Sequence, residues 1–267
     1  MLSKGEEFLH IIEVNPPAYP DMSHKHLEDK WGHVIITDNV FGTIRVSPFA
    51  FGARLAHDVP GMETTVVVST RDRNILAIES EVRGALWNGV DSYLVVVGDS
   101  FPTVEHNSNH FEIVEHLLEL QETIPAFEVG MPARFRRWHL QRRIDLGAQF
   151  FEVGPVVDPD TIEEQVKRME LEPDDPPVFL SVIPPFSQSF VDRVVDMGGV
   201  SVTDRLRSDL DSLDKEDRRE YAWKRAGECS EVAEGLGLAG VVVMGLRYET
   251  AVGEDAAAWH MERHGQN

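Results

Sequence analysis

The chain has 267 residues, of which 42% are hydrophobic, and this length suffices for one large α/β domain or two small ones. Its formal net charge of −21 at pH 7 argues against a sequence-independent nucleic-acid binder or an anionic-membrane binder, because a negative field repels phosphates. An anionic ligand would therefore need a locally basic site.

The first predicted element is a strand over residues 9–14, which contains Glu13 and is broken by Pro16 and Pro17. A carboxylate at the end of an apolar strand loses hydration, and this loss raises its pKa. A raised carboxyl pKa suits a proton donor near neutral pH. The alternative is a carboxylate at a wet strand end, next to a lysine or arginine, with no chemical role.

Seven more apolar runs of strand length follow, most of them continuous rather than alternating, as is typical of parallel strands covered on both faces. Segments with helical periodicity separate many of them. The expected strands are 9–14, 33–37, 65–69, 93–97, 126–129, 149–153, 178–183 and 240–245; the expected helices are 74–88, 110–120, 133–146, 160–171, 190–197, 205–236 and 255–264. This alternation favours an α/β fold in which residues 1–267 form a single (β/α)8 TIM barrel.

In such a barrel the site lies at the carboxyl ends of the strands. Polar residues at the expected ends form the candidate set: Glu13, Asn15, Thr37, Asp38, Asn39, Ser69, Thr70, Arg71, Asp72, Asp99, Glu128, Glu152 and Arg247. Glu13, Asp99, Arg71 and Arg247 are the least expected there on structural grounds.

Two segments resemble the methylenetetrahydrofolate reductase family: Thr70-Arg71-Asp72-Arg73-Asn74, followed after a helix by Gly98-Asp99, and the Glu13-Val14-Asn15-Pro16-Pro17 start. The resemblance extends in order over nearly the whole chain at low identity. It implies reduction of 5,10-methylenetetrahydrofolate to 5-methyltetrahydrofolate in one-carbon metabolism and methionine biosynthesis. It further implies that Glu13 is the general acid and that Asp99 stabilises the cationic iminium intermediate.

Several positions depart from the family pattern, including Val67, Val97 and the Val153-Gly154 pair, where the family has a glutamine that contacts folate. Most of the lost positions are those that the resemblance assigns to the flavin. The resemblance then implies direct hydride transfer from NAD(P)H, and the lost contacts argue against a bound FAD. The expected binding residues are Thr37, Asn39, Ser69, Arg71, Asp72, Glu128, Gly154 and Arg247. Arg136, Arg137, Arg142 and Arg143 could hold a flavin phosphate or form a solvated helix face.

Two alternatives stay open: a non-catalytic folate-binding or regulatory TIM barrel, and a reductase of another pterin that uses a deazaflavin. No metal site is expected, because the histidines lie in polar loops without a ligand pattern. A single cysteine, Cys229, excludes an intrachain disulfide and suits a reducing compartment. The charged amino terminus is unlike a signal peptide, and the apolar runs are too short to span a bilayer, so we expect a cytoplasmic protein without membrane or nucleic-acid partners. The sequence leaves the oligomeric state open.

Overall fold

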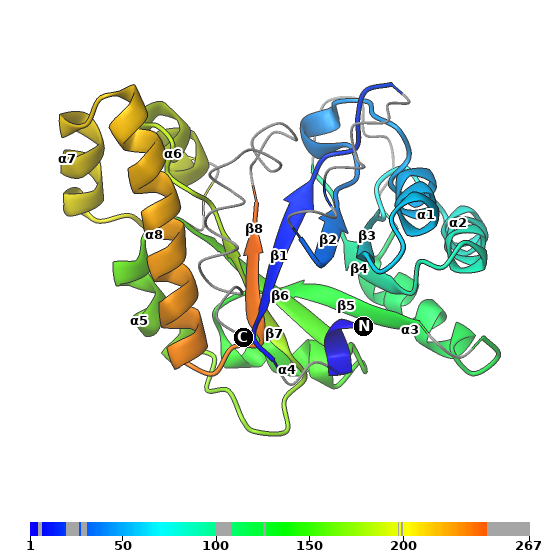
Figure 1. Cartoon of the computed structure of the whole chain (residues 1–267). Helices are drawn as coiled ribbons and strands as arrows, with labels where there is room; N and C mark the ends of the chain where they lie inside the picture. The colour runs from blue at the N-terminus through cyan, green and yellow to red at the C-terminus, as the bar shows by residue number, and fades with distance from the viewer. Residues whose placement is uncertain are drawn as a thin grey trace.

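A computed structural model describes residues 1–4, 7–19, 27, 31–99, 108–124, 127–196, 198 and 200–244. Eight strands close into a barrel in the order β1 to β8, and every neighbouring pair is parallel (Figure 1). The expected (β/α)8 barrel is therefore confirmed. The strands are β1 (Leu9–Val14), β2 (His33–Ile36), β3 (Glu63–Ser69), β4 (Ser92–Val96), β5 (Glu128–Ala133), β6 (Phe150–Val156), β7 (Val178–Val182) and β8 (Gly240–Val243).

Helices follow most of the strands and pack on the outside of the barrel, with α1 and α2 on one side and α6, α7 and α8 on the other (Figure 1). Side-chain caps start several of them; for example, Asn74 accepts from the amide of Ala77, and Asp214 accepts from the amides of Glu216 and Asp217. The α-helices are α1 (Pro48–Asp58), α2 (Ile75–Trp87), α3 (His110–Leu120), α4 (Arg137–Ile144), α5 (Ile162–Lys167), α6 (Gln188–Asp196), α7 (Asp204–Ser212) and α8 (Lys215–Gly235); the 3-10 helices are η1 (Leu2–Lys4), η3 (Val40–Gly42) and η4 (Pro159–Thr161).

The structure corrects several element boundaries. The helix expected over 205–236 is two helices, because Asp214 starts α8 with its own cap. Helix α4 is shorter than expected, since Ala133 ends β5 instead of opening the helix. Helix α1 was not among the expected elements. The helix expected over 255–264 lies outside the described residues.

Two apolar layers stabilise the barrel. The larger one lies between the strands and the surrounding helices and includes Ile12, Val34 and Val241. The smaller one fills the barrel interior and consists of Leu2, Ile11, Ile35, Val67, Leu94, Phe150, Phe179 and Val242. A side chain at Gly130 would collide with this inner layer, because an added Cβ would lie 2.3 Å from the ring of Phe150.

The amino end of the barrel is closed by η1. Leu2 is 1% exposed and packs into the inner layer, and the Glu128 carboxylate accepts the amides of Leu2 at 2.5 Å and Ser3 at 2.8 Å. Just above, His33, Thr65 and Ser92 form a hydrogen-bonded chain with two links of 2.8 Å. These buried polar groups at the amino end thus bond to one another.

Within the part of the chain that the structure describes, no helix combines the length and apolar character needed to cross a membrane.

Candidate functional site

Five polar side chains form a layer at the carboxyl end of the barrel interior. Each stands two residues beyond a member of the inner apolar layer, four of them within a strand and Thr37 directly after β2, so strand alternation directs them to the same inner face. We call this set the inner polar layer: Glu13, Thr37, Ser69, Glu152 and Ser181. The sequence therefore brings two acids and three hydroxyls from five strands to the end where barrel enzymes and binders hold their ligands.

Glu152 on β6 has a single hydrogen-bond partner in this layer. Its Oε1 accepts a short hydrogen bond from the hydroxyl of Ser181 on β7, and no other partner is present among the described residues. Burial raises the pKa of Glu152, and the Ser181 hydrogen bond opposes that rise. A carboxylate that is costly to ionise and has one donor is poised to gain from a ligand that brings further donors.

The backbone just beyond Glu152 opens this layer to solvent. Gly154 is exposed, and its φ of 119° lies in a region that favours glycine. An added Cβ would stand 2.9 Å from the carbonyl oxygen of Ser181. Gly154 was expected past the end of its strand, whereas β6 continues to Val156, so Gly154 belongs to the strand that carries Glu152.

Glu13 and Asp99, the two expected catalytic acids, both lie at the carboxyl end of the barrel. Glu13 points inward from β1, where it pairs with Ile35 of β2. Asp99 stands three residues beyond the end of β4, and its carbonyl oxygen accepts from Arg71 at 3.0 Å. Their catalytic roles stay predictions.

Arg71 braces the loops that follow β2, β3 and β4. Its guanidinium donates to the backbone carbonyls of Asp99 at 3.0 Å, Asn39 at 3.3 Å and Asp38 at 3.4 Å, and the residue is 8% exposed. These bonds consume donors that a folate or cofactor would need. Arg71 therefore stabilises these loops, independently of any ligand in the barrel.

The rest of the Thr70–Asn74 segment has structural partners too. Arg73 forms a close ion pair with the buried Asp38 and stacks over the Phe49 ring at 5.6 Å. Thr70 donates to the carbonyl of Val97 at 3.5 Å, and Asn74 caps α2. These contacts connect the end of β3 to the neighbouring loops and to α2. They explain the polar residues of the segment without requiring the activity of the reductase family.

The remaining expected binding residues also hold loops at this end. The Thr37 hydroxyl donates to Asn15 Oδ1 at 2.7 Å. Asn39 adopts a left-handed conformation, and its side chain accepts the Arg45 amide at 2.9 Å. Ser69 Oγ accepts the Arg71 amide at 3.3 Å, and Asp72 has a φ of 52° in the turn before α2.

One expected site residue lies at the wrong end. Glu128 is the first residue of β5 rather than near its last, because the strand runs to Ala133, and its carboxylate is taken up by η1. Its expected place beside a ligand at the carboxyl end is therefore wrong. Arg247 lies outside the described residues.

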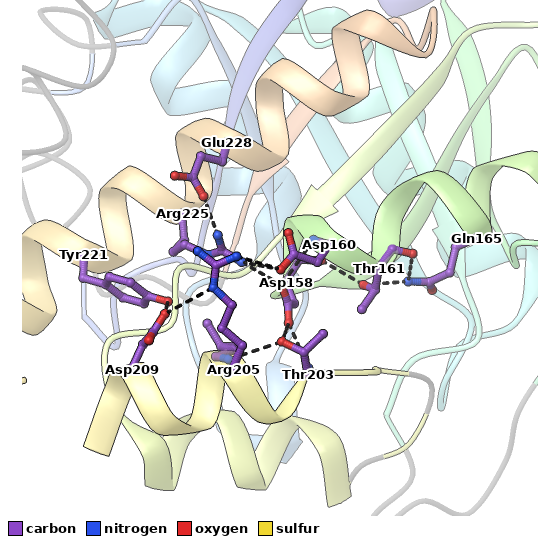
Figure 2. A network of polar contacts seen from close by, with 11 residues as sticks. Asp158, Asp160, Thr161, Gln165, Thr203, Arg205, Asp209, Tyr221, Arg225 and Glu228 are labelled. Atoms are coloured by element: carbon purple, nitrogen blue, oxygen red, sulfur yellow. Dashed lines mark hydrogen bonds and ion pairs between the residues drawn. The ribbon is translucent and has the colours of Figure 1, made fainter. Parts of the chain in front are cut away.

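A buried charge network fixes the chain that leaves β6 (Figure 2). Asp158 is fully buried and accepts from Arg225 Nη2 at 2.8 Å, from the Thr203 amide at 2.8 Å and from the Thr203 hydroxyl at 2.7 Å. Arg225 also pairs with Glu228 at 2.5 Å and Asp160 at 3.6 Å. Since Asp158 follows β6 by two residues, the network ties α7 and α8 to the strand end that carries Glu152.

Sequence reasoning placed Glu152 in the wider candidate set but not among the final site residues, and it missed Ser181. The Ser181 signal was weak, because one hydroxyl inside the apolar run of residues 178–182 resembles any half-buried strand serine. Among the described residues, no group of three or more histidine, cysteine or carboxylate side chains is arranged to hold a metal ion.

A groove of about 320 Å³ lies elsewhere, at the amino ends of β7 and β8, and includes Pro177, Val178 and Ala239 in its lining. It is at the opposite end from the inner polar layer. We assign it no part in the site, because barrel chemistry collects at the carboxyl ends of the strands.

The comparisons with known proteins support the fold. No family model matches the chain, and no curated protein matches it. Among solved structures, it is similar to an uncharacterized protein from Clostridium thermocellum that binds two copies of 5-methyl-5,6,7,8-tetrahydrofolic acid, with a TM-score of 0.65 and 15% identity over 97% of this chain and 95% of that one. It is also similar to 2,3-dimethylmalate lyase, a PEP mutase/isocitrate lyase superfamily member (TM-score 0.54, 10% identity, 97% and 84% coverage), and to oxaloacetate acetylhydrolase (TM-score 0.56, 11% identity, 98% and 82% coverage).

These findings overturn the expected membership of the methylenetetrahydrofolate reductase family. No model of that or any family matches, and the similar structures are a different folate-binding barrel and members of a lyase superfamily. The motif that carried the resemblance has a structural explanation in the Arg71 and Arg73 contacts. At these identities the similar structures establish the barrel alone.

Proposed function

We propose that the carboxyl end of the barrel binds a reduced folate and that Glu152 pairs with its pterin ring. A pterin carries a ring N–H and an exocyclic amino group side by side, and this pair of donors matches the two oxygens of one carboxylate. Glu152 supplies an inward carboxylate with a single described partner, the Ser181 hydroxyl. This under-satisfied acid is the observation that carries the proposal.

The similar structure from Clostridium thermocellum supports the ligand class, because that protein binds 5-methyl-5,6,7,8-tetrahydrofolic acid and aligns over 97% of this chain. The inner polar layer also suits a ligand with many polar groups. A flat bicyclic ring needs several hydrogen-bonding groups around its edge, and two acids and three hydroxyls face the same space. Glu13 then stands on a different strand from Glu152, where it can hold a proton or accept a bond from the far side of the ring.

The test is calorimetric titration of 5-methyltetrahydrofolate into the wild-type protein and into Glu152→Gln. The amide keeps the shape but replaces one acceptor oxygen by a donor, so the bidentate pair is lost. We expect roughly 30- to 150-fold weaker binding, the equivalent of about 2–3 kcal/mol for charge-assisted hydrogen bonds. Glu234→Gln, which removes an exposed carboxylate from α8, is the matched control and should leave the affinity unchanged.

Equal affinities of wild type and Glu152→Gln would refute the assignment of Glu152, and no binding by the wild-type protein would refute the function. Chromatography of the ligand recovered after incubation separates a binder from an enzyme, since an enzyme alters its ligand and a binder returns it. NAD(P)H and FAD stay predictions that rest on the withdrawn resemblance. The absorbance spectrum of the purified protein tests the flavin directly.

A further inference from the structure

Beside the inner polar layer lies a group of cations that have no counter-ion in the described part of the chain. We call Arg134, Arg142 and Arg143 the arginine cluster; His139 and His110 lie close enough to be electrostatically coupled to it. Arg134 follows the carboxyl end of β5, Arg142 and Arg143 lie on α4, and His110 opens α3.

Among the residues that the structure describes, no carboxylate forms an ion pair with this cluster. Arg137, in the first turn of the same helix, shows the usual alternative, because it forms a close pair with Asp175 and a second one with Glu172 at 3.5 Å. Arg143 instead donates to two backbone carbonyls, those of Pro132 at 2.7 Å and His139 at 2.9 Å, and it is 6% exposed. In a chain of net charge −21, three neighbouring arginines that find no carboxylate partner within the described ranges are unexpected.

The electrostatics agree with this geometry. Burial, then repulsion by Arg142 and Arg134, lowers the pKa of Arg143 to about 10. Burial, then repulsion chiefly by Arg143, lowers the pKa of His139 to about 4. His139 is therefore neutral at pH 7, and its Nδ1 accepts the Arg134 amide at 3.1 Å. The positive side chains of the cluster repel one another, and a bound anion would reduce this repulsion.

The guanidinium groups are held in place before any ligand arrives. Arg142 stacks over the Phe111 ring at 4.2 Å and Arg143 stacks at 5.3 Å, which fixes the planes of both forks. The first turn of α3, which carries Phe111, adds the positive end of a helix dipole. Glu112 in that turn is exposed and accepts from Asn109 at 3.1 Å instead of pairing with an arginine.

The cluster lies one strand away from Glu152. Pro132, whose carbonyl accepts from Arg143, pairs with Glu152 across β5 and β6. Neighbouring strands are about 4.8 Å apart, so a ligand with its head at Glu152 can reach the cluster by crossing the end of a single strand. Arg134 and Arg142 are exposed on this path.

We propose that the arginine cluster binds the carboxylates of the glutamate tail of the folate whose pterin ring lies against Glu152. The inference rests on the proposed function, and it makes a γ-linked polyglutamate form the preferred ligand. Arginine forks bind carboxylates and phosphates alike, so the shared chemistry is an oxyanion, and phosphate is the other source that the experiment must distinguish.

The test compares 5-methyltetrahydrofolate carrying one glutamate with the same compound carrying three, by calorimetric titration. The wild-type protein should bind the triglutamate form at least tenfold more tightly. In Arg142→Gln this ratio should fall below threefold, because the affinity for the triglutamate form should drop more than the affinity for the monoglutamate form. Arg54→Gln is the matched control, since it removes an exposed arginine with a local partner, Asp58, and should keep the wild-type ratio.

Free γ-linked triglutamate and tripolyphosphate serve as probes that need no pterin site. Triglutamate that binds the wild type but not Arg142→Gln upholds the cluster even if neither folate binds, in which case only the proposed function fails. Tripolyphosphate that binds at least tenfold more tightly than triglutamate overturns the assignment to a glutamate tail. A ratio near one for the two folates, together with no binding of either free anion, overturns the site.

Discussion

Glu128 and Glu152 are two inward-facing glutamates at opposite ends of one barrel, and they have opposite surroundings. At the amino end, Glu128 is 1% exposed and accepts two backbone amides from η1. At the carboxyl end, Glu152 accepts one hydroxyl, from Ser181, and lies next to the exposed Gly154. The fold supplies two backbone donors to the first acid, whereas the second has one donor among the described residues.

The contrast shows how one residue type serves stability or binding according to its donors. An acid that receives its hydrogen bonds from the chain stabilises the folded state, and its removal leaves buried amides without acceptors. An acid that receives few costs stability through its desolvation, so its presence calls for another explanation. Asp158 extends the series, because it receives three bonds from Arg225 and Thr203 and a weaker one from the Asp160 amide at 3.2 Å.

Asp158→Ala should have the largest effect on stability. It leaves Arg225 partly uncompensated and removes the acceptor for Thr203, which unties α7 and α8 from the end of β6. We expect the free energy of unfolding to fall by about 3–5 kcal/mol, measured by urea denaturation. Asp160→Ala in the adjoining η4 is the control and should cost less than about 1 kcal/mol, because Asp160 is largely exposed and makes longer ion pairs. Similar losses for the two variants would contradict the ranking.

Glu128→Ala should come second. The amides of Leu2 and Ser3 lose their acceptor near the closed end of the barrel, and we expect a loss of about 2–3 kcal/mol in the free energy of unfolding. Folate affinity should not change, since the change lies at the far end from the inner polar layer. Glu122→Ala, an exposed acid, provides the baseline. A loss of affinity in Glu128→Ala that exceeds its baseline would show that the two ends are not independent.

Glu152→Gln should have the smallest effect on stability, and one of opposite sign. Because the pKa of Glu152 is raised in the folded state, the folded protein keeps this proton at pH values where the unfolded chain has lost it. The free energy of unfolding of the wild type therefore falls as the pH rises from the ordinary value of 4.5 through the raised pKa. Gln has no proton to lose, so the variant should melt about 2–4 °C above the wild type at pH 8 and level with it at pH 4. A variant that melts below the wild type at pH 8 would place Glu152 with Glu128 among the satisfied acids.

The fold was predictable because its signals are local. Apolar runs such as residues 178–182 and the repeated change from strand to helix period identify a parallel barrel before any contact is known. Boundaries were harder. The Met131-Pro132-Ala133 segment continues β5 because its backbone pairs with β6, which neither propensity nor periodicity indicates.

The site was predictable only in outline. The polar residues at the predicted strand ends included Glu13 and Glu152, which lie at the carboxyl end of the barrel. The sequence did not show which of these acids has more hydrogen-bond donors around it. The resemblance favoured the Thr70–Asn74 segment, whose polar groups turned out to hold loops together, as in the ion pair between Arg73 and Asp38. The sequence does not show which group a polar side chain bonds to. A residue that holds two loops together therefore cannot be distinguished from one that contacts a ligand.

The sequence by itself determined the barrel, its acidic surface and the end where polar residues collect, because hydrophobic period, charge and strand order are properties of the chain. Only the tertiary structure decided which acids are satisfied, since donors such as the Leu2 amide lie far from their acceptor Glu128 in sequence. It also decided that Arg137 pairs with Asp175, whereas Arg142 stacks on Phe111 and has no counter-ion among the described residues. Both distinctions depend on which donors and acceptors folding brings within hydrogen-bond distance of a charged group. Those contacts decide whether a buried charge has a structural or a binding role.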